Sequence, residues 1–314
     1  MRILITTGLT SHDTGGPAQY GPKLKEEFEK LGHAVKIAQY GSIESALFRV
    51  LPKVLWADRV IALDTFSVGV PTVLASRLFG KEVTVRIGGD FLWESYIERT
   101  GNKLTLKQFN TNIPKLNTKE RLILYFTKIL TKLAGKLAFN TEWQKDIWQK
   151  TYDISHVKSC VVRNYIPGKN TDVSTGDYFL WAGRTIKLKN ISLLKELSKE
   201  FKIEIVSGLP HTELQDKIKK CYAVVLPSFS EVCPNFILEA ISYGKPFIMT
   251  EETGLKEIYN RGGIFIKPFD KKALKEAILS MLDTAQYRQH QEALLSYESR
   301  PWRKVAEDFL SIWR

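Results

Sequence analysis

Cysteine is scarce in this chain of 314 residues, and the three that occur, Cys160, Cys221 and Cys233, are widely separated. None belongs to a CxxC pair or to a cysteine–histidine cluster. This spacing argues against a disulfide framework and against a structural zinc site, and it favours a reducing compartment.

Long hydrophobic runs are also missing. No stretch approaches the roughly 18 apolar residues that a membrane-spanning helix needs. The first residues, MRILITTGLTSHD, turn polar after a short apolar stretch and do not have the pattern of a signal peptide. No internal repeat or low-complexity segment is present. We therefore expect a soluble, cytoplasmic protein.

Acidic residues are too few to balance the basic ones, 34 against 46, which leaves a formal charge of +12. The excess is concentrated in Arg99–Lys136, which holds nine basic residues and one acid, Glu120. Such a segment suits a polyanionic partner, which could be an anionic membrane surface, a phosphorylated substrate or nucleic acid, or it simply keeps a surface soluble. Nucleic acid is not expected, because no aromatic-rich basic sheet or recognition-helix motif is present.

Part of this basic segment has helical periodicity. Apolar residues recur at helical spacing, and lysines recur every four residues; the apolar positions are Leu122, Phe126, Ile129, Leu130, Leu133 and Leu137. The interpretation that we favour buries the apolar stripe in the domain core and leaves Lys128, Lys132 and Lys136 in water. In the alternative, the helix lies on anionic lipid headgroups and would make the protein peripheral at the inner face of the membrane.

Hydrophobic residues make up 44% of the chain and charged residues 25%, the balance of a globular protein, and the length is typical of two domains. Apolar runs of strand length alternate with helix-period segments, which predicts an α/β fold with parallel sheets. The expected strands are 2–6, 34–38, 59–63, 82–87, 136–139 and 159–162, then 178–181, 203–206, 223–226, 246–249 and 264–266. A helix is expected over Pro22–Leu31, closed by Gly32.

A turn-rich stretch beginning at Asn164 interrupts this alternation, which places a domain boundary there. We expect a first Rossmann-like domain over residues 1–166 and a second over 167–300, both doubly wound and facing a central cleft. Residues 301–314 form an amphipathic helix with Trp302 and Trp313. It either crosses back to the first domain or packs on the second.

The most informative stretch follows the strand that ends at Leu226. Pro234 is placed to open a helix at its first position, which leaves the backbone N–H groups around Asn235 and Phe236 without helical partners. A helix N-terminus of this kind attracts anions such as phosphate.

Two carboxylates accompany this anion site, Glu231 before the helix and Glu239 on its second turn. Carboxylates beside an anion are unfavourable unless they accept hydrogen bonds from ligand hydroxyls. Sugars and riboses supply such hydroxyls in pairs, so the arrangement suits a ligand with phosphates in the middle and polyols at both ends. That ligand is a nucleotide sugar.

Cations follow the first strand of the second half. Arg184 and either Lys187 or Lys189 can reach a diphosphate, arginine as a fork and lysine as a point charge. No DxD pair is present where a metal would be expected, so we expect no metal and no cofactor, with Arg, Lys and the helix dipole neutralising the leaving group. Gly15 and Gly16 allow the backbone to approach a ligand closely, or they form an ordinary turn.

These motifs resemble the retaining nucleotide-sugar glycosyltransferases of family 4, which have the two-domain GT-B fold. The resemblance spans the whole chain and is most specific in its second half. It is carried by Gly15-Gly16-Pro17, Gly183-Arg184 with Lys189, Pro227-Ser-Phe-Ser-Glu231 with Glu239, Gly244-Lys-Pro and Thr253-Gly-Leu-Lys-Glu257.

The resemblance implies roles for individual residues. Glu231 would bind donor-sugar hydroxyls, Glu239 the ribose, and Arg184 with Lys189 the diphosphate. The backbone near Pro234, Asn235 and Phe236 would hold sugar and phosphate, and Gly183 would border the donor. Gly16 would approach the diphosphate from the other domain.

One departure from the family concerns the sugar side. Many members carry a histidine after the fourth strand, whereas this chain has Val85-Arg-Ile-Gly-Gly-Asp-Phe-Leu-Trp-Glu. The stretch is similar to a subgroup pattern, so Gly89 and Asp90 are candidates for the sugar or acceptor side, as is Gly15. The five histidines have no spacing typical of a triad or a metal site, so we interpret them as surface or core residues.

The predicted function is therefore a metal-independent retaining glycosyltransferase of hexosyltransferase type, acting in polysaccharide biosynthesis. It would transfer a sugar from a nucleotide-sugar donor to an acceptor hydroxyl on a glycan, a lipid-linked sugar or a small molecule. Two alternatives remain: a sugar-nucleotide epimerase on the same fold, and a non-catalytic interaction module that has kept the fold.

Overall fold

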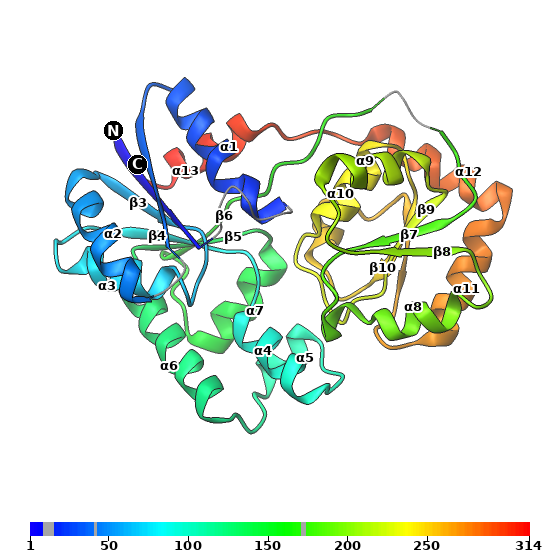
Figure 1. Ribbon diagram of the computed structural model, residues 1–314, viewed down its shortest axis with the longest axis horizontal. Coiled ribbons are helices and arrows are strands. Elements are labelled where there is room, and N and C mark those ends of the chain that lie inside the picture. Colours follow the sequence, from blue (N-terminus) through cyan, green and yellow to red (C-terminus); the bar gives the residue numbers. More distant parts are fainter. Residues whose placement is uncertain (9–15, 41–42, 171–173) are drawn as a thin grey trace. The chain divides into compact units, whose positions relative to one another are not determined.

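The computed structural model describes residues 1–8, 16–40, 43–170 and 174–314. The chain divides into two compact units, each an α/β arrangement around a parallel sheet (Figure 1). The first unit comprises Met1–Tyr96, Asn110–Asn164 and Trp302–Arg314, and the second comprises Ile97–Phe109 and Tyr165–Pro301.

The sheet of the first unit has the strand order β2-β1-β3-β4-β5-β6, with every neighbouring pair parallel. Its strands are β1 (Arg2–Thr7), β2 (Ala34–Gln39), β3 (Arg59–Ala62), β4 (Val83–Ile87), β5 (Lys136–Phe139) and β6 (Ser159–Val161). The central strands are almost wholly buried, as expected when helices cover both faces of a parallel sheet. Every strand expected in the first half is present, and each of its ends lies within one residue of the predicted position.

The helices that follow these strands are α1 (Gly16–Lys30), α2 (Ile43–Trp56), α3 (Gly69–Arg77), α4 (Phe91–Thr100), α5 (Leu106–Thr111), α6 (Thr118–Leu133) and α7 (Glu142–Tyr152). The start predicted for the first helix, Pro22, is wrong, because Pro22 lies inside α1. Pro17 instead occupies the first turn, where the missing N–H of a proline costs no helical hydrogen bond.

The prediction that the apolar stripe of α6 lies in the core is only partly correct. The buried face of this helix consists of Glu120, Ile123, Thr127, Leu130 and Thr131. Of the stripe expected in the core, Leu130 and Leu137 are buried, whereas Leu122 is 51% exposed. The other three members, Phe126, Ile129 and Leu133, are half-buried. A second apolar stripe is therefore left on the outer side of this helix.

The C-terminal helix α13 (Trp302–Ser311) packs in the first unit, beside α1 (Figure 1). The ring of Trp302 meets Tyr20 edge-on, and the indole of Trp313 stacks on Phe28 with ring centroids 6.0 Å apart. Trp313 also donates from Nε1 to Thr84 Oγ1 over 2.8 Å, and its carbonyl accepts from Arg59. The last turn of the chain thus contacts three separate elements of this unit.

The second unit is built on a sheet of order β11-β10-β9-β7-β8, again parallel. Its strands are β7 (Phe179–Ala182), β8 (Ile203–Val206), β9 (Ala223–Leu226), β10 (Phe247–Thr250) and β11 (Gly263–Ile266). Its helices and turns are η1 (Lys187–Lys189), α8 (Ile191–Leu197), α9 (His211–Lys220), α10 (Asn235–Ser242), η2 (Gly254–Glu257), α11 (Lys271–Leu282), α12 (Thr284–Ala293) and η3 (Leu294–Ser296). The strands lie within one residue of the predicted positions.

One continuous hydrophobic core fills the second unit, from Phe179 and Trp181 on β7 to Met281 on α11. Lys245 lies fully buried beside it and donates from Nζ to the carbonyl of Cys221 over 2.7 Å.

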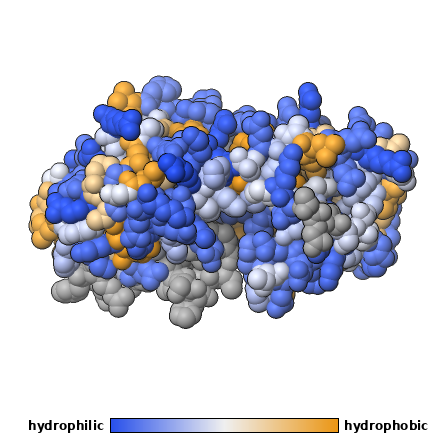
Figure 2. Space-filling view, turned by 90° about the horizontal axis from the view of Figure 1, so that it is seen from above, coloured by the Kyte–Doolittle hydropathy of each residue, from blue (hydrophilic) through white to orange (hydrophobic). Residues whose placement is uncertain are grey.

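The face of the molecule seen in Figure 2 is mainly hydrophilic, with hydrophobic residues in small separate groups. The order of β10, β9 and β7 at the centre of the second unit's sheet determines which loops meet.

Candidate functional site

Three loops of the second unit leave neighbouring strands at the same edge of the sheet. Lys189 follows β7, Glu231 follows β9 and Glu252 follows β10, and these strands are adjacent in the order β10-β9-β7. Because the strands are parallel, their carboxyl ends lie together, which is where open α/β sheets bind ligands. The topology thereby brings together residues that are far apart in the sequence.

Lys189 and Glu231 form an ion pair in which Lys189 Nζ lies 2.5 Å from Glu231 Oε1. The side chains are 18% and 9% exposed, so the pair is largely screened from water. The backbone of Glu231 is held as well, because its N–H donates to the Glu252 carbonyl and its own carbonyl accepts from Gly254 N. Two of the residues predicted to bind the donor are thus in direct contact.

The structure also separates the two lysines between which the sequence left a choice. Lys187 donates from Nζ to the carbonyl of Glu98 over 2.6 Å, and its backbone N–H donates to the Glu98 carboxylate. Lys189 reaches Glu231 instead. Lys189 is therefore the lysine of η1 that lies at the carboxylate.

The other residues predicted after β7 lie nearby in the chain but are more open. Gly183 is half-buried, and its N–H donates to the Val206 carbonyl over 3.3 Å. Arg184 has an exposed side chain, and its carbonyl accepts from Ile186 N.

Helix α10 begins one residue later than expected. Pro234 is its N-cap residue and not its first helical residue, and its carbonyl accepts from the N–H groups of Ile237 and Leu238. Among the residues that the structure describes, no backbone carbonyl accepts from Asn235 N or Phe236 N. Pro234 offers no side-chain cap, so this helix start can receive an anion as the sequence suggested.

Glu239 lies on α10 and contacts His211, the first residue of α9. His211 Nε2 and Glu239 Oε1 are 3.2 Å apart, and this hydrogen bond raises the pKa of the histidine above its ordinary value. The second oxygen, Glu239 Oε2, is buried and has no hydrogen-bond partner among the described residues. A buried acceptor without a donor is costly, so it suits a ligand hydroxyl.

In the described part of the chain, two further buried polar atoms near these loops have no hydrogen-bond partner. They are Ser228 Oγ, in the loop after β9, and Glu252 Oε2, in the loop after β10. Burial raises the pKa of the Glu252 carboxyl, and the charge of Lys107 partly opposes this. Together with Glu239 Oε2, these atoms give the described part of the second unit three buried acceptors without donors.

The candidates of the first unit are placed differently. Gly15 lies outside the described residues, and Gly16 is the first residue of α1. Gly89 precedes α4, and a Cβ built on it would lie 3.2 Å from Glu94 Oε1. Asp90 is 2% exposed; its carboxylate accepts from Trp93 N over 3.0 Å and from Asn110 Nδ2 over 3.1 Å. Burial raises the pKa of Asp90, whose carboxylate holds the start of α4 in place.

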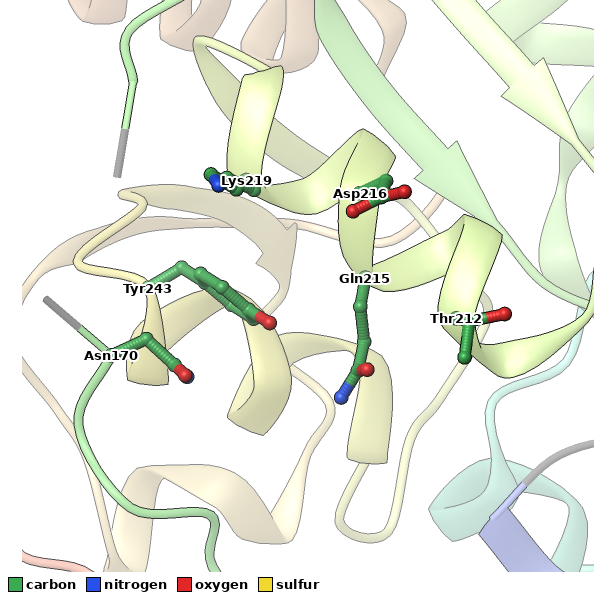
Figure 3. A pocket seen from close by; sticks show the side chains of 6 residues that line it. All are labelled: Asn170, Thr212, Gln215, Asp216, Lys219 and Tyr243. Carbon is green, nitrogen blue, oxygen red and sulfur yellow. The ribbon is translucent and has the colours of Figure 1, made fainter. Parts of the chain in front are cut away.

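A shallow polar pocket of about 310 Å³ lies elsewhere on the second unit, between α9 and the end of α10 (Figure 3). The side chains of Gln215 and Tyr243 extend toward each other across it, with Asn170 beside them. Its lining contains no candidate residue. The pocket and the predicted site are therefore distinct.

Among the described residues, no three histidine, cysteine, aspartate or glutamate side chains come together as a metal site would require. No helix in that part of the chain has the length and apolar character to cross a membrane.

Sequence reasoning missed two residues of this region, His211 and Glu252. His211 is 28 positions from Glu239, and no local motif connects them, so only the packing of α9 against α10 reveals the contact. Glu252 had a usable signal, because it follows a buried strand just before Thr253-Gly254. Polar residues at the carboxyl end of a parallel strand are candidates for a site.

Comparison with known proteins connects this region to glycosyltransferases. Residues 169–293 match the family described as glycosyl transferases group 1. A stretch of 76 residues is 34% identical to TuaC of Bacillus subtilis (strain 168), which is named as a teichuronic acid biosynthesis glycosyltransferase. The matched stretch covers 24% of this chain and 20% of TuaC. The resemblance to glycosyltransferases is confirmed, while the nucleotide-sugar donor and membership of family 4 stay predictions.

Solved structures resemble the chain over its whole length. Sucrose-phosphate synthase from Thermosynechococcus elongatus has a TM-score of 0.73 at 13% identity, covering 100% of this chain and 98% of that one. HepE of Anabaena, solved in complex with UDP, has a TM-score of 0.69 at 12% identity, covering 100% and 99%. These likenesses confirm the GT-B fold with two Rossmann-like domains. The likeness to glycosyltransferases in sequence is that of the family match over residues 169–293.

Proposed function

We propose that this protein is a retaining, metal-independent glycosyltransferase that transfers a sugar from a nucleotide-sugar donor to an acceptor hydroxyl. The observation that carries the proposal is the contact of Lys189 with Glu231, beside a helix start whose first N–H groups have no backbone acceptor among the described residues. A cation, a carboxylate and free N–H groups in one place suit a ligand that has both phosphates and hydroxyls.

Each part of the site has a proposed task. Lys189, Arg184 and the start of α10 neutralise the diphosphate as it leaves, without a metal ion. Glu231 accepts hydrogen bonds from hydroxyls of the donor sugar. Glu239 accepts a hydrogen bond from the ribose through Oε2, which has no partner among the described residues.

In the proposed reaction the bond between the anomeric carbon and the diphosphate oxygen breaks, and a bond from that carbon to the acceptor oxygen forms on the same face. The acceptor hydroxyl gives its proton to the departing phosphate oxygen, so no protein base is required. Gly15, Gly89 and Asp90 remain predictions for the sugar or acceptor side, and Gly16 remains a prediction for the diphosphate. The acceptor is a hydroxyl on a glycan, a lipid-linked sugar or a small molecule.

Binding of the donor can be tested by melting the protein with a panel of nucleoside diphosphates and nucleotide sugars in the presence of EDTA. Bound ligand raises the melting temperature by mass action. UDP is the first nucleotide to try, because HepE, which has a similar fold, was solved with UDP. A shift that EDTA does not remove supports a metal-free donor site, and a panel without any shift contradicts it.

The two lysines of η1 supply a matched pair of variants. Lys189→Ala should abolish the shift caused by nucleoside diphosphate, whereas Lys187→Ala should keep it, because Lys187 contacts Glu98 instead. Equal effects of the two variants would remove Lys189 from the site. Conversion of the donor in the absence of any acceptor would favour an epimerase over a transferase.

A further inference from the structure

The outer side of α6 carries an apolar stripe that the first unit leaves uncovered. Leu122 is 51% exposed and Tyr125 is 59% exposed, at the start of a stripe that continues through the half-buried Phe126 and Ile129. The stripe lies on a different face of the helix from Ile123, Thr127 and Leu130, which are buried. Single exposed apolar residues are ordinary, but a helical stripe of them needs a partner.

Neighbouring segments add exposed apolar residues beside the stripe. At the middle of α6, Phe126 contacts Phe66, which stacks on Phe91 with centroids 5.6 Å apart, and Phe91 is itself exposed. At the C-terminal end of α6, Arg77 on α3 donates to the Leu133 carbonyl over 2.8 Å. Leu78, which follows Arg77, is 75% exposed.

Basic side chains border the same stripe. Lys119, Arg121, Lys128 and Lys132 are all exposed on α6. The acidic residue of this helix, Glu120, is buried and takes part in a capping box with Asn117. The outer side of α6 therefore presents cations beside apolar groups, with no helix carboxylate to offset them.

We infer that this surface, the outer side of α6 with Leu78 and Phe91, docks on an anionic lipid bilayer. Apolar side chains flanked by Lys and Arg are what an interfacial helix requires: the first enter the boundary of the acyl chains, and the second meet the headgroup phosphates. Tyr125 suits this depth, because it has an apolar ring and a polar hydroxyl.

Two other binding partners would account for only part of the charge and apolar area of this surface. A soluble polyanion would pair with the lysines but leave Leu122 and Tyr125 in water. A second copy of the chain, related by a two-fold axis, would bring the same cations against each other. A bilayer accounts for both the charge and the apolar area. The surface belongs to the first unit and the proposed donor residues to the second, so docking and transfer can be tested separately.

The test is co-sedimentation of the full chain with vesicles of phosphatidylcholine, with and without about 30% phosphatidylglycerol. We expect binding to the anionic vesicles alone, weakened at about 0.5 M salt by screening. Glycerophosphate, which carries the phosphate without the acyl chains, should not displace the protein. Absence of binding to anionic vesicles, or full displacement by glycerophosphate, would overturn the inference.

Two pairs of substitutions on α6 test whether its outer side is the surface that binds the bilayer. Lys128→Gln with Lys132→Gln, and separately Leu122→Gln with Tyr125→Ser, should each lower the partition coefficient by about tenfold or more. Leu295→Gln and the pair Lys195→Gln with Lys199→Gln are matched controls, since they change exposed residues of the second unit. These side chains are exposed, so every variant should melt like the parent. Unchanged partitioning of the α6 variants, or self-association that these variants abolish, would contradict docking on lipid.

Discussion

Lys189 and Glu231 are 42 positions apart in the chain, yet their charged atoms lie 2.5 Å from each other. The contact arises because β7 and β9 are neighbours and both end at the same edge of the sheet. In the proposed function, the diphosphate contacts Lys189 and the donor sugar contacts Glu231. The ion pair is therefore both a feature of the fold and part of the proposed chemistry.

A double-mutant cycle on this pair should show strong coupling. Removing one partner leaves the other charge largely buried without compensation, so the effects of Lys189→Met and Glu231→Gln on the free energy of unfolding should not add. We expect a coupling energy of about 1–3 kcal/mol, measured by urea unfolding of the two single variants and the double variant. Additive effects would show that the pair does not act as a unit.

The contact of His211 with Glu239 predicts a pH-dependent contribution to stability. The folded-state pKa of His211 is raised above about 6.5, so the folded protein binds this proton more tightly than the unfolded chain does. The stabilisation is complete below the unfolded pKa and is lost as pH rises through the folded pKa. His211→Ala should therefore cost more stability at about pH 5.5 than at about pH 8.5.

His290 is the matched control, because burial lowers its pKa. Its contribution has the opposite sign: stability rises with pH as the histidine becomes neutral. His290→Ala should therefore remove a rise in stability with pH. A result for His211→Ala with the same slope as His290→Ala would contradict the contact with Glu239.

Asp90 should matter for stability more than for nucleotide binding. Asp90→Ala removes the acceptor for Trp93 N and Asn110 Nδ2, so we expect a loss of about 2 kcal/mol in the free energy of unfolding. Asp90→Asn should cost less, because it keeps an acceptor oxygen and removes a charge whose burial is unfavourable. The melting shift with nucleoside diphosphate should persist in both variants. Loss of that shift would place Asp90 at the nucleotide.

Trp313 should stabilise the first unit from the end of the chain. Trp313→Ala removes the stacking on Phe28 and the hydrogen bond to Thr84, and the half-buried position suggests a cost of about 2 kcal/mol. Urea unfolding measures the change, with the exposed neighbour Arg314→Ala as the control. Equal stability of both variants would show that the last turn contributes nothing.

The strands were predictable because fully buried parallel strands give short apolar runs that need no knowledge of their neighbours. Helix faces were harder. On α6, apolar residues occupy two adjacent faces, and the face that is buried includes Glu120, Thr127 and Thr131. The sequence favours the more apolar face, whereas packing against α3 and the capping box of Glu120 select the other.

The residues of the candidate site were also only partly predictable from the sequence. Glu231 and Glu239 were recognisable because a motif places them around one helix start. The choice of Lys189 over Lys187 and the contact of His211 with Glu239 depend on how loops and helices pack, which no local spacing encodes. The sequence thus predicts which elements carry the chemistry, and the structure shows which of the predicted side chains touch.

The position of α13 has a consequence for synthesis on the ribosome. Because α13 belongs to the first unit, the residues of the second unit are all translated before the first unit receives its last helix. Until then, Phe28 and Tyr20 lack their tryptophan partners. The unit that begins to emerge first is therefore completed last, and a nascent chain must protect that apolar surface while the second unit folds.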